Sequence, residues 1–321
     1  MPRDCGMPFQ VPKCQVVPLP DSQASLQIDG RERLRWHFDA NYPRPFFYPF
    51  NGPSGETLTR MGHPGAPNHD HHRSVWWAHA KVDGENFWAD TSKARIRQKM
   101  WLAYADGDEE AMMATSAGWF NGEGKEIMEQ EMVASVRPGP DGETFLELQS
   151  TFTPTGEQVT LEQSNFGFLA VRMAKGIATY WGEGEITSSE GVKGEPQIFG
   201  QSAAWMDYSG AVPKRDKGKR VAVTEGITYF DHEDNPSYPS HWHVREDGWM
   251  GASLCRHEAI MIKKDKPLRV RYLLHAHNGK VSPVLAGRIS ELFNASPGFT
   301  VFKSKRKHRQ FEVQREGKKK N

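Results

Sequence analysis

Residues 94–107 (ARIRQKMWLAYADG), 109–122 (EEAMMATSAGWFNG) and 143–156 (ETFLELQSTFTPTG) decide the fold class. Each run mixes apolar and polar residues and ends at a glycine that follows Asp, Asn or Thr. Short runs bounded in this way are typical of antiparallel strands joined by turns. The same spacing continues along most of the chain, and helical segments do not alternate with it as they would in βαβ units. The sequence therefore predicts a mainly β protein, a large antiparallel β-sandwich with few short helices.

Two stretches are candidates for helix. Residues 125–135 (KEIMEQEMVAS) are compatible with either a strand or a helix. Residues 282–293 (SPVLAGRISELF) carry apolar side chains at the spacing of an amphipathic helix. Those apolar residues are Val284, Leu285, Ile289, Leu292 and Phe293.

The ends of the chain differ in composition from its body. Residues 1–23 contain five of the 21 prolines and predict an extended arm, residues 24–302 a single β domain, and residues 303–321 a solvated, frayed basic tail. That tail holds nine Lys and Arg against two Glu, so a chain with a net charge of +1 has a body near −6. Such a body is not basic enough to indicate nucleic-acid binding.

Composition excludes several other classes of protein. The mean hydropathy is −0.69, and no apolar run approaches the roughly 18–20 residues that a membrane helix needs. The N-terminus lacks the apolar core of a secretory signal, so we expect a soluble, cytoplasmic protein without a membrane partner. The three cysteines, Cys5, Cys14 and Cys255, fit neither a zinc ribbon nor a redox CxxC motif. Nothing in the sequence indicates an oligomeric state.

Residues 41–90 are the most chemically unusual part of the chain. They contain five of the 13 histidines and three tryptophans. If residues 69–79 (HDHHRSVWWAH) are extended, alternate residues share one face. That face would carry His69, His71, Arg73, Val75, Trp77 and His79.

Three interpretations of residues 69–79 remain open. Histidines near their free pKa can act as acids and bases or bind sugar hydroxyls. His69 and His71 could instead ligate a divalent metal, the one possible cofactor, with further ligands from residues 232–243. The third interpretation is structural, with histidines bonded to the backbone around a buried tryptophan pair. Trp76 and Trp77 would point to opposite faces, so at most one of them can stack on a ligand.

A second candidate for a functional segment is 230–248 (FDHEDNPSYPSHWHVREDG). Its prolines and polar residues predict a long irregular loop. His241 and His243 are two residues apart and could face the same way. Asp231 and His232 could be a histidine with its orienting carboxylate, or ordinary turn residues.

The order of these motifs resembles a family of bacterial proteins called the PmoA family (methane oxygenase PmoA). The resemblance covers roughly residues 30–290 and rests on HDHHRSVWW and DHEDNPSYPSHWHVR. It implies no catalytic residues, and a particulate methane monooxygenase subunit spans the membrane, which this composition does not predict. The strand pattern is also similar to the galactose-mutarotase-type supersandwich, which implies sugar binding on a sheet without naming a reaction.

The sequence therefore predicts an enzyme that performs proton-transfer chemistry on a sugar or sugar acid, as an epimerase, lyase or hydrolase. The alternatives are a non-catalytic carbohydrate-binding protein and a histidine-ligated metalloenzyme, possibly an oxygenase. We predict acid and base groups at His71, His72, His241, His243, Glu131 and Glu190. We predict substrate binding by Arg44, Arg73, Trp77, His79 and Arg245, and metal ligation by His69 and His71.

Overall fold

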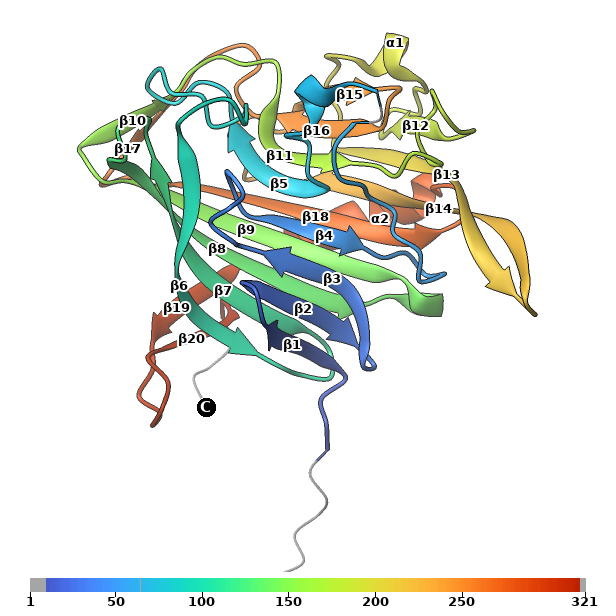
Figure 1. Ribbon diagram of the computed structural model, residues 1–321, viewed down its shortest axis with the longest axis horizontal. Coiled ribbons are helices and arrows are strands. Elements are labelled where there is room, and N and C mark those ends of the chain that lie inside the picture. Colours follow the sequence, from blue (N-terminus) through green and yellow to red (C-terminus); the bar gives the residue numbers. More distant parts are fainter. Residues whose placement is uncertain (1–9, 64, 318–321) are drawn as a thin grey trace, which may run out of the picture.

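The structure is a computed structural model that describes residues 10–63 and 65–317. In this part of the chain the strands form two eight-stranded antiparallel sheets, which lie face to face in Figure 1. The antiparallel β-sandwich is thus confirmed. In spatial order the first sheet consists of β1 (Cys14–Leu19), β2 (Gln23–Ile28), β3 (Arg31–His37), β4 (Phe46–Phe50), β5 (Val75–His79), β11 (Gly167–Arg172), β16 (Trp249–Ser253) and β15 (His241–Arg245).

Most strands of the second sheet are longer than those of the first. Smaller elements surround both sheets. Its spatial order is β12 (Glu185–Ser188), β13 (Trp205–Asp216), β14 (Lys219–Asp231), β18 (Leu268–Asn278), β9 (Thr144–Pro154), β8 (Glu126–Pro138), β7 (Ala111–Phe120) and β6 (Arg95–Ala105). The smaller elements are the pairs β10 (Gln158–Leu161) with β17 (Ile260–Lys263) and β19 (Phe299–Lys303) with β20 (Phe311–Arg315), the helices α1 (Glu195–Ile198) and α2 (Pro283–Ala295), and the 3-10 turns η1 (Pro67–His69) and η2 (Pro140–Gly142).

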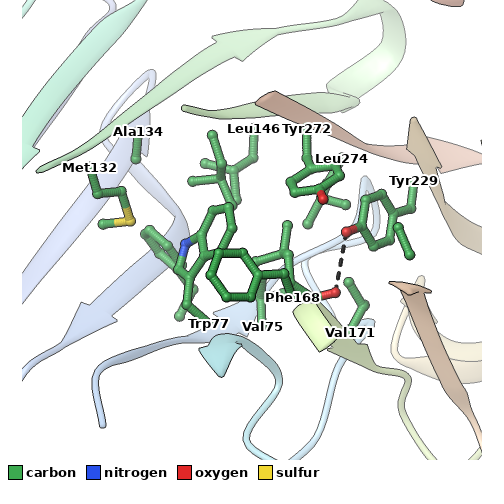
Figure 2. Packing of buried hydrophobic residues seen from close by; sticks show 14 of the residues in the cluster. Val75, Trp77, Met132, Ala134, Leu146, Phe168, Val171, Tyr229, Tyr272 and Leu274 are labelled. Atoms are coloured by element: carbon green, nitrogen blue, oxygen red, sulfur yellow. Dashed lines mark hydrogen bonds between the residues drawn. The ribbon is translucent and has the colours of Figure 1, made fainter. Parts of the chain in front are cut away.

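The core lies between the two sheets because alternate strand residues point inward. In β5, Val75 and Trp77 belong to this core, whereas Trp76 and Ala78 belong to a separate cluster on the outer face. Figure 2 shows Trp77 packed among residues of the second sheet. The same alternation sets the outward residues of β11, β16 and β15, which form the candidate site described below.

Of residues 125–135, residues 126–135 lie in strand β8 (Glu126–Pro138), so the helix alternative is wrong. Met128, Gln130 and Met132 alternate toward the core, and β8 pairs along its length with β7 and β9. Burial of this alternate set and two ladders of hydrogen bonds outweigh the helix propensity of Glu, Met and Ala, which is a weak preference.

The predicted helix at residues 282–293 is confirmed as α2. Ser282 caps it by accepting a hydrogen bond from the backbone N–H of Leu285. Phe293 is buried against the second sheet, while Leu292 remains exposed. No helix in the described part of the chain is long and apolar enough to cross a membrane.

Both predicted terminal segments contain strands. Residues 14–19 of the predicted arm are strand β1, which pairs with β2. Residues 311–315 of the predicted tail are strand β20, where Arg315 pairs with Glu147 of β9 and with Glu110, which directly precedes β7. Burial of these partners orders a segment whose charge alone suggests a frayed end. Residues 1–9 and 318–321 lie outside the described residues.

Two fully buried tyrosines in the core provide a matched test of its hydrogen bonding. Tyr229 donates from Oη to the carbonyl oxygen of Leu169 across the sandwich at 3.2 Å (Figure 2), whereas Tyr272 Oη has no partner among the described residues. We expect Tyr229→Phe to lower the free energy of unfolding by about 1 kcal/mol, because it removes a satisfied hydrogen bond. Tyr272→Phe should be neutral or stabilising, because it removes an unsatisfied hydroxyl. Urea unfolding of both variants measures this difference, and equal effects would contradict it.

Candidate functional site

The candidate site lies on the outer face of the first sheet, where β5, β11, β16 and β15 run side by side. Residues that alternate with core positions point outward here. They include Trp76 on β5, Arg172 on β11, Trp249 on β16 and His243 on β15. The sheet thus presents aromatic, basic and titratable side chains from segments that are far apart in the sequence.

A cluster of six rings forms on this face, with Trp249 at its centre. The indole of Trp249 stacks on that of Trp88, with ring centroids 5.1 Å apart and planes at 9°. His243 stacks against Trp249 at 4.8 Å, and His72 meets it edge-on at 4.7 Å. Trp249 therefore joins the two histidine-rich segments of the sequence. We call these rings the aromatic cluster: His72, Trp76, Trp88, Phe166, His243 and Trp249.

The aromatic cluster contains four buried polar ring atoms that have no hydrogen-bond partner among the described residues. They are both ring nitrogens of His72 and the indole Nε1 atoms of Trp76 and Trp249. A buried donor or acceptor without a partner costs about 1–3 kcal/mol, and native structures keep few of them. Atoms retained in this state indicate a place where water or a ligand supplies the missing hydrogen bonds.

His243 is a neutral imidazole with one available nitrogen. Burial, followed by the charge of Arg245, lowers the pKa of His243 to about 4. Its Nδ1 lies 3.1 Å from the carbonyl oxygen of Asn165, which can only accept, so we place the proton on Nδ1. No described residue donates a hydrogen bond to Nε2, which can therefore accept a proton from a ligand at neutral pH.

Beside the aromatic cluster, an arginine and a histidine converge on one carboxylate. Arg172 is fully buried and forms a bidentate ion pair with Asp247, with Nη–Oδ distances of 2.7 and 3.0 Å. His63 Nε2 lies 2.9 Å from Asp247 Oδ2. Burial opposes ionisation of Asp247, but the hydrogen bonds and charge of Arg172, and then those of His63, keep the pKa of this carboxyl below its ordinary value. The charged carboxylate orients the His63 ring.

Four histidines of the segment 63–72 lie close together. Ring centroids are 5.3 Å apart for His63 and His69, 5.2 Å for His69 and His72, and 4.3 Å for His71 and His72. Burial and then Arg44 lower the pKa of His71 to about 4. Within residues 10–63 and 65–317, no three His, Cys, Asp or Glu side chains are arranged to hold a metal ion. Metal ligation by His69 and His71, whose centroids are 5.9 Å apart, stays a prediction.

Two of the three arginines predicted to bind substrate, Arg44 and Arg73, hold residues 87–90 against the sheet. Arg44 is almost fully buried and donates to the carbonyl oxygens of Phe87 and Trp88 at 3.0 and 2.6 Å, and to Asp90 at 3.1 Å. Arg73 forms an ion pair with the same Asp90 carboxylate, and it also donates a long hydrogen bond of 3.5 Å to the carbonyl oxygen of His71. Both side chains therefore position Trp88 in the aromatic cluster.

The interpretation of residues 69–79 as one extended face is wrong. Only residues 75–79 form a strand, because the chain turns through η1 and Ser74 adopts a left-handed φ of +55°. Trp77 points into the core, so the outward ring on this strand is Trp76. His79, predicted to bind substrate, is buried with its Nε2 2.8 Å from the carbonyl oxygen of Glu162.

The pair His241 and His243 faces outward as its spacing predicts, but from strand β15 rather than from a loop. Of these two histidines, His243 belongs to the aromatic cluster, through its contacts with Trp249 and Phe166. His241 lies beside His257, with ring centroids 4.3 Å apart. Arg245 extends from the same strand to Glu195 at 2.7 Å.

Asp231 and His232 do not form the predicted histidine–carboxylate pair. The Asp231 carboxylate accepts hydrogen bonds from Asn235 and from the backbone of Ser240. The Nε2 atom of His232 lies 2.7 Å from Arg271 Nη1 on the second sheet. These groups fix the 232–240 turn and do not reach the aromatic cluster.

The two predicted carboxylates lie away from the histidines. Glu131 is on β8, where its neighbours Gln130 and Met132 point to the core, so it faces the outer side of the second sheet. Burial, followed by Glu129, raises its pKa. Glu190 is exposed in the turn after β12 and accepts a hydrogen bond from Ser189. The structure therefore brings neither carboxylate to the predicted acid–base site.

Several residues of the site were not candidates from the sequence. Arg172 and Asp247 are separated by 75 positions, so no local spacing connects them. Trp249 follows the turn residues Asp247 and Gly248, and a tryptophan at the start of a strand is its only local signal. Phe166 lies in a turn with no periodic pattern.

Comparisons with known proteins identify a family but no activity. Residues 23–291 match the model of a family of unknown function, DUF6807, and that match does not carry the name PmoA. No functionally curated protein matches the chain.

Two solved structures are distantly similar. One is 4-alpha-glucanotransferase from Thermococcus litoralis, with 8% identity, a TM-score of 0.32 and 84% of this chain covered; this chain spans 40% of the length of that one. The other is HI1317, with 10% identity, a TM-score of 0.26, and 84% and 97% of the two chains covered. Similarity at this level carries no inference, and the galactose-mutarotase-type arrangement stays a prediction.

Proposed function

Because the chain belongs to the DUF6807 family, whose function is unknown, we propose its function from the site alone. The protein binds a sugar or sugar acid on the outer face of its first sheet and performs proton-transfer chemistry on it. The resemblance to proteins named PmoA adds no reaction to this proposal.

The observation that carries the proposal is the aromatic cluster with its unpartnered nitrogens. Sugars combine an apolar face of C–H groups with a rim of hydroxyls. Ligand sites for such molecules are lined by aromatic rings with a few placed polar groups. Trp249 and Trp88, stacked on each other, supply an aromatic wall, and His72 and Trp76 supply buried ring nitrogens that a hydroxyl would satisfy.

His243 is the proton acceptor in this proposal. Its ring stacks on Trp249, and its free Nε2 is unprotonated at neutral pH because burial lowers its pKa. His63, held by the Asp247 carboxylate, is the candidate for the complementary proton donor. Removal of a C–H or O–H proton by His243 with return of a proton elsewhere is the step common to epimerases, lyases and hydrolases.

The test measures binding and proton transfer separately. Neutral sugars and sugar acids are screened by calorimetry, and each ligand is then followed by NMR in D₂O for deuterium incorporation or product. We expect Trp249→Phe to weaken binding by about tenfold through loss of stacking area. His243→Gln should keep binding and lose exchange. The matched control is Trp77→Phe, the same change on the core face of β5 in the same sheet, which should leave affinity unchanged.

Each outcome has a defined meaning. Equal loss of affinity in the Trp249 and Trp77 variants would show that the outer face is not the binding surface. Saturable binding without exchange or product, unaffected by His243→Gln, would replace the enzyme with a non-catalytic carbohydrate-binding protein.

A further inference from the structure

A group of cationic side chains borders the aromatic cluster at the end formed by β15. The guanidinium groups of Arg245 and Arg256 both lie over the ring of Phe199, at 4.4 and 4.9 Å from its centroid. His241 and His257 lie beside each other nearby, with ring centroids 4.3 Å apart, and burial, followed by Arg256 among the charged neighbours, lowers the pKa of His241. We call the guanidinium groups of Arg245 and Arg256 the cationic cluster; His241 and His257 lie beside it as imidazoles that can donate N–H hydrogen bonds.

The cationic cluster lacks one counter-charge. Arg245 pairs with Glu195 at 2.7 Å. Arg256 has no carboxylate within ion-pair distance among the described residues, and its only side-chain hydrogen bond is a long one of 3.5 Å to the carbonyl oxygen of Asn165. The charge of Arg245 acts directly on Arg256, so two like charges lie close together, and among the described residues only Arg245 of the two has a carboxylate partner. An anion placed here removes that repulsion.

The cationic cluster is continuous with the proposed catalytic histidine. The ring of Phe199 meets that of His243 edge-on at 4.9 Å. The carbonyl oxygen of Asn165 contacts both His243 Nδ1 and Arg256. An open cavity of about 380 Å³ lies beside this region and is lined by Phe199 and Arg245, together with Pro196 and the carboxylates of Glu195 and Glu246. A group bound at Arg256 is therefore one ring away from His243.

We infer that Arg256, with His241 and His257, binds the carboxylate of an acidic sugar whose ring lies against His243 and Trp249. The inference rests on the proposed function and narrows its substrate class to uronic acids. The planar fork of an arginine without a carboxylate partner matches the two oxygens of a carboxylate. The carboxylate also increases the acidity of the proton on the adjacent carbon, which a base such as His243 would remove.

The experiment compares the binding of uronic acids with that of the corresponding neutral sugars. It uses the full chain, variants of Arg256 and a control variant at another arginine. Calorimetry measures the dissociation constants of glucuronate and glucose, galacturonate and galactose, and mannuronate and mannose. We expect at least one acid to bind about tenfold or more tightly than its neutral partner, the range of a hydrogen-bonded charge. Arg256→Gln should abolish that preference, and Arg256→Lys should keep part of it. Arg220→Gln, at an exposed position of the β13–β14 hairpin, should leave it unchanged.

The outcomes separate this inference from the proposed function. If acids and neutral sugars bind equally, or if acid preference survives Arg256→Gln, the carboxylate subsite is overturned while the sugar site stands. If acid binding is lost in Arg256→Gln but unchanged in Trp249→Phe, the anion site stands and the sugar site is overturned. Tighter binding of glucose 1-phosphate than of glucuronate would overturn the assignment to a carboxylate.

Discussion

Replacing Asp247 with alanine is expected to lower the free energy of unfolding by about 3 kcal/mol. The change leaves the fully buried guanidinium of Arg172 without its bidentate partner, and an uncompensated buried charge typically costs about 3–5 kcal/mol. The lower end applies because the Asp247 side chain is 29% exposed, so water replaces part of the lost interaction. Urea unfolding at neutral pH measures the change.

A second variant separates charge burial from a general loss of packing. In the double variant Asp247→Ala, Arg172→Met, no charge is stranded, so we expect it to be more stable than Asp247→Ala alone by at least about 1 kcal/mol. The control is Asp234→Ala, whose side chain is 85% exposed, and which should change stability by less than about 0.5 kcal/mol. A double variant less stable than the single one would contradict this account.

The ion pair of Arg172 with Asp247 is an example of a contact that the sequence does not predict. Helix α2 was predictable because its apolar residues repeat at a helical spacing and Ser282 caps it, both of which are local features. The partnership of Arg172 with Asp247 joins two strands that meet only through the sheet order, and no local pattern reports it. The strands themselves were predictable from alternation and turn residues.

The choice between Trp76 and Trp77 was not decidable from the sequence for a different reason. Alternation identifies the core face of a strand only when the other face is polar. All residues of β5 are buried, because the outer face is covered by Trp88, Phe166 and the segment that carries His72. Both faces are therefore apolar, and the sequence offers no contrast that tells which tryptophan is outward.

Residues 125–135 are a case in which the helix propensity of individual residues favours the wrong kind of secondary structure. Glu and Met favour a helix in isolation, yet Met128, Gln130 and Met132 also repeat with the period of a strand. The neighbours β7 and β9 decide between the two patterns, and they are known only from the assembled sheet.

The stability of the protein is expected to fall as the pH decreases from about 7 toward 4, and part of that fall should depend on His243. The folded-state pKa of His243 is about 4 because the ring is buried, against 6.5 for the free group. Between these values the unfolded chain binds one more proton than the folded chain, so lowering the pH favours unfolding. The difference of about 2.5 pKa units corresponds to a loss of up to about 3 kcal/mol from this residue, which is 6% exposed.

The measurement compares wild type with His243→Gln, which keeps a side-chain donor for the Asn165 carbonyl and does not titrate. Free energies of unfolding at pH 8, 7, 6 and 5 should converge as the pH falls, because only wild type has the extra proton uptake. His71 and His232 have pKa values lowered to about 4 and act in the same direction, whereas the pKa of His277 is raised by Asp207 despite its burial. These contributions are common to both proteins and cancel in the difference. A wild-type minus variant difference that stays constant from pH 8 to pH 5 would mean that His243 is not buried as a neutral base, and the proposed proton acceptor would have to be sought elsewhere in the aromatic cluster.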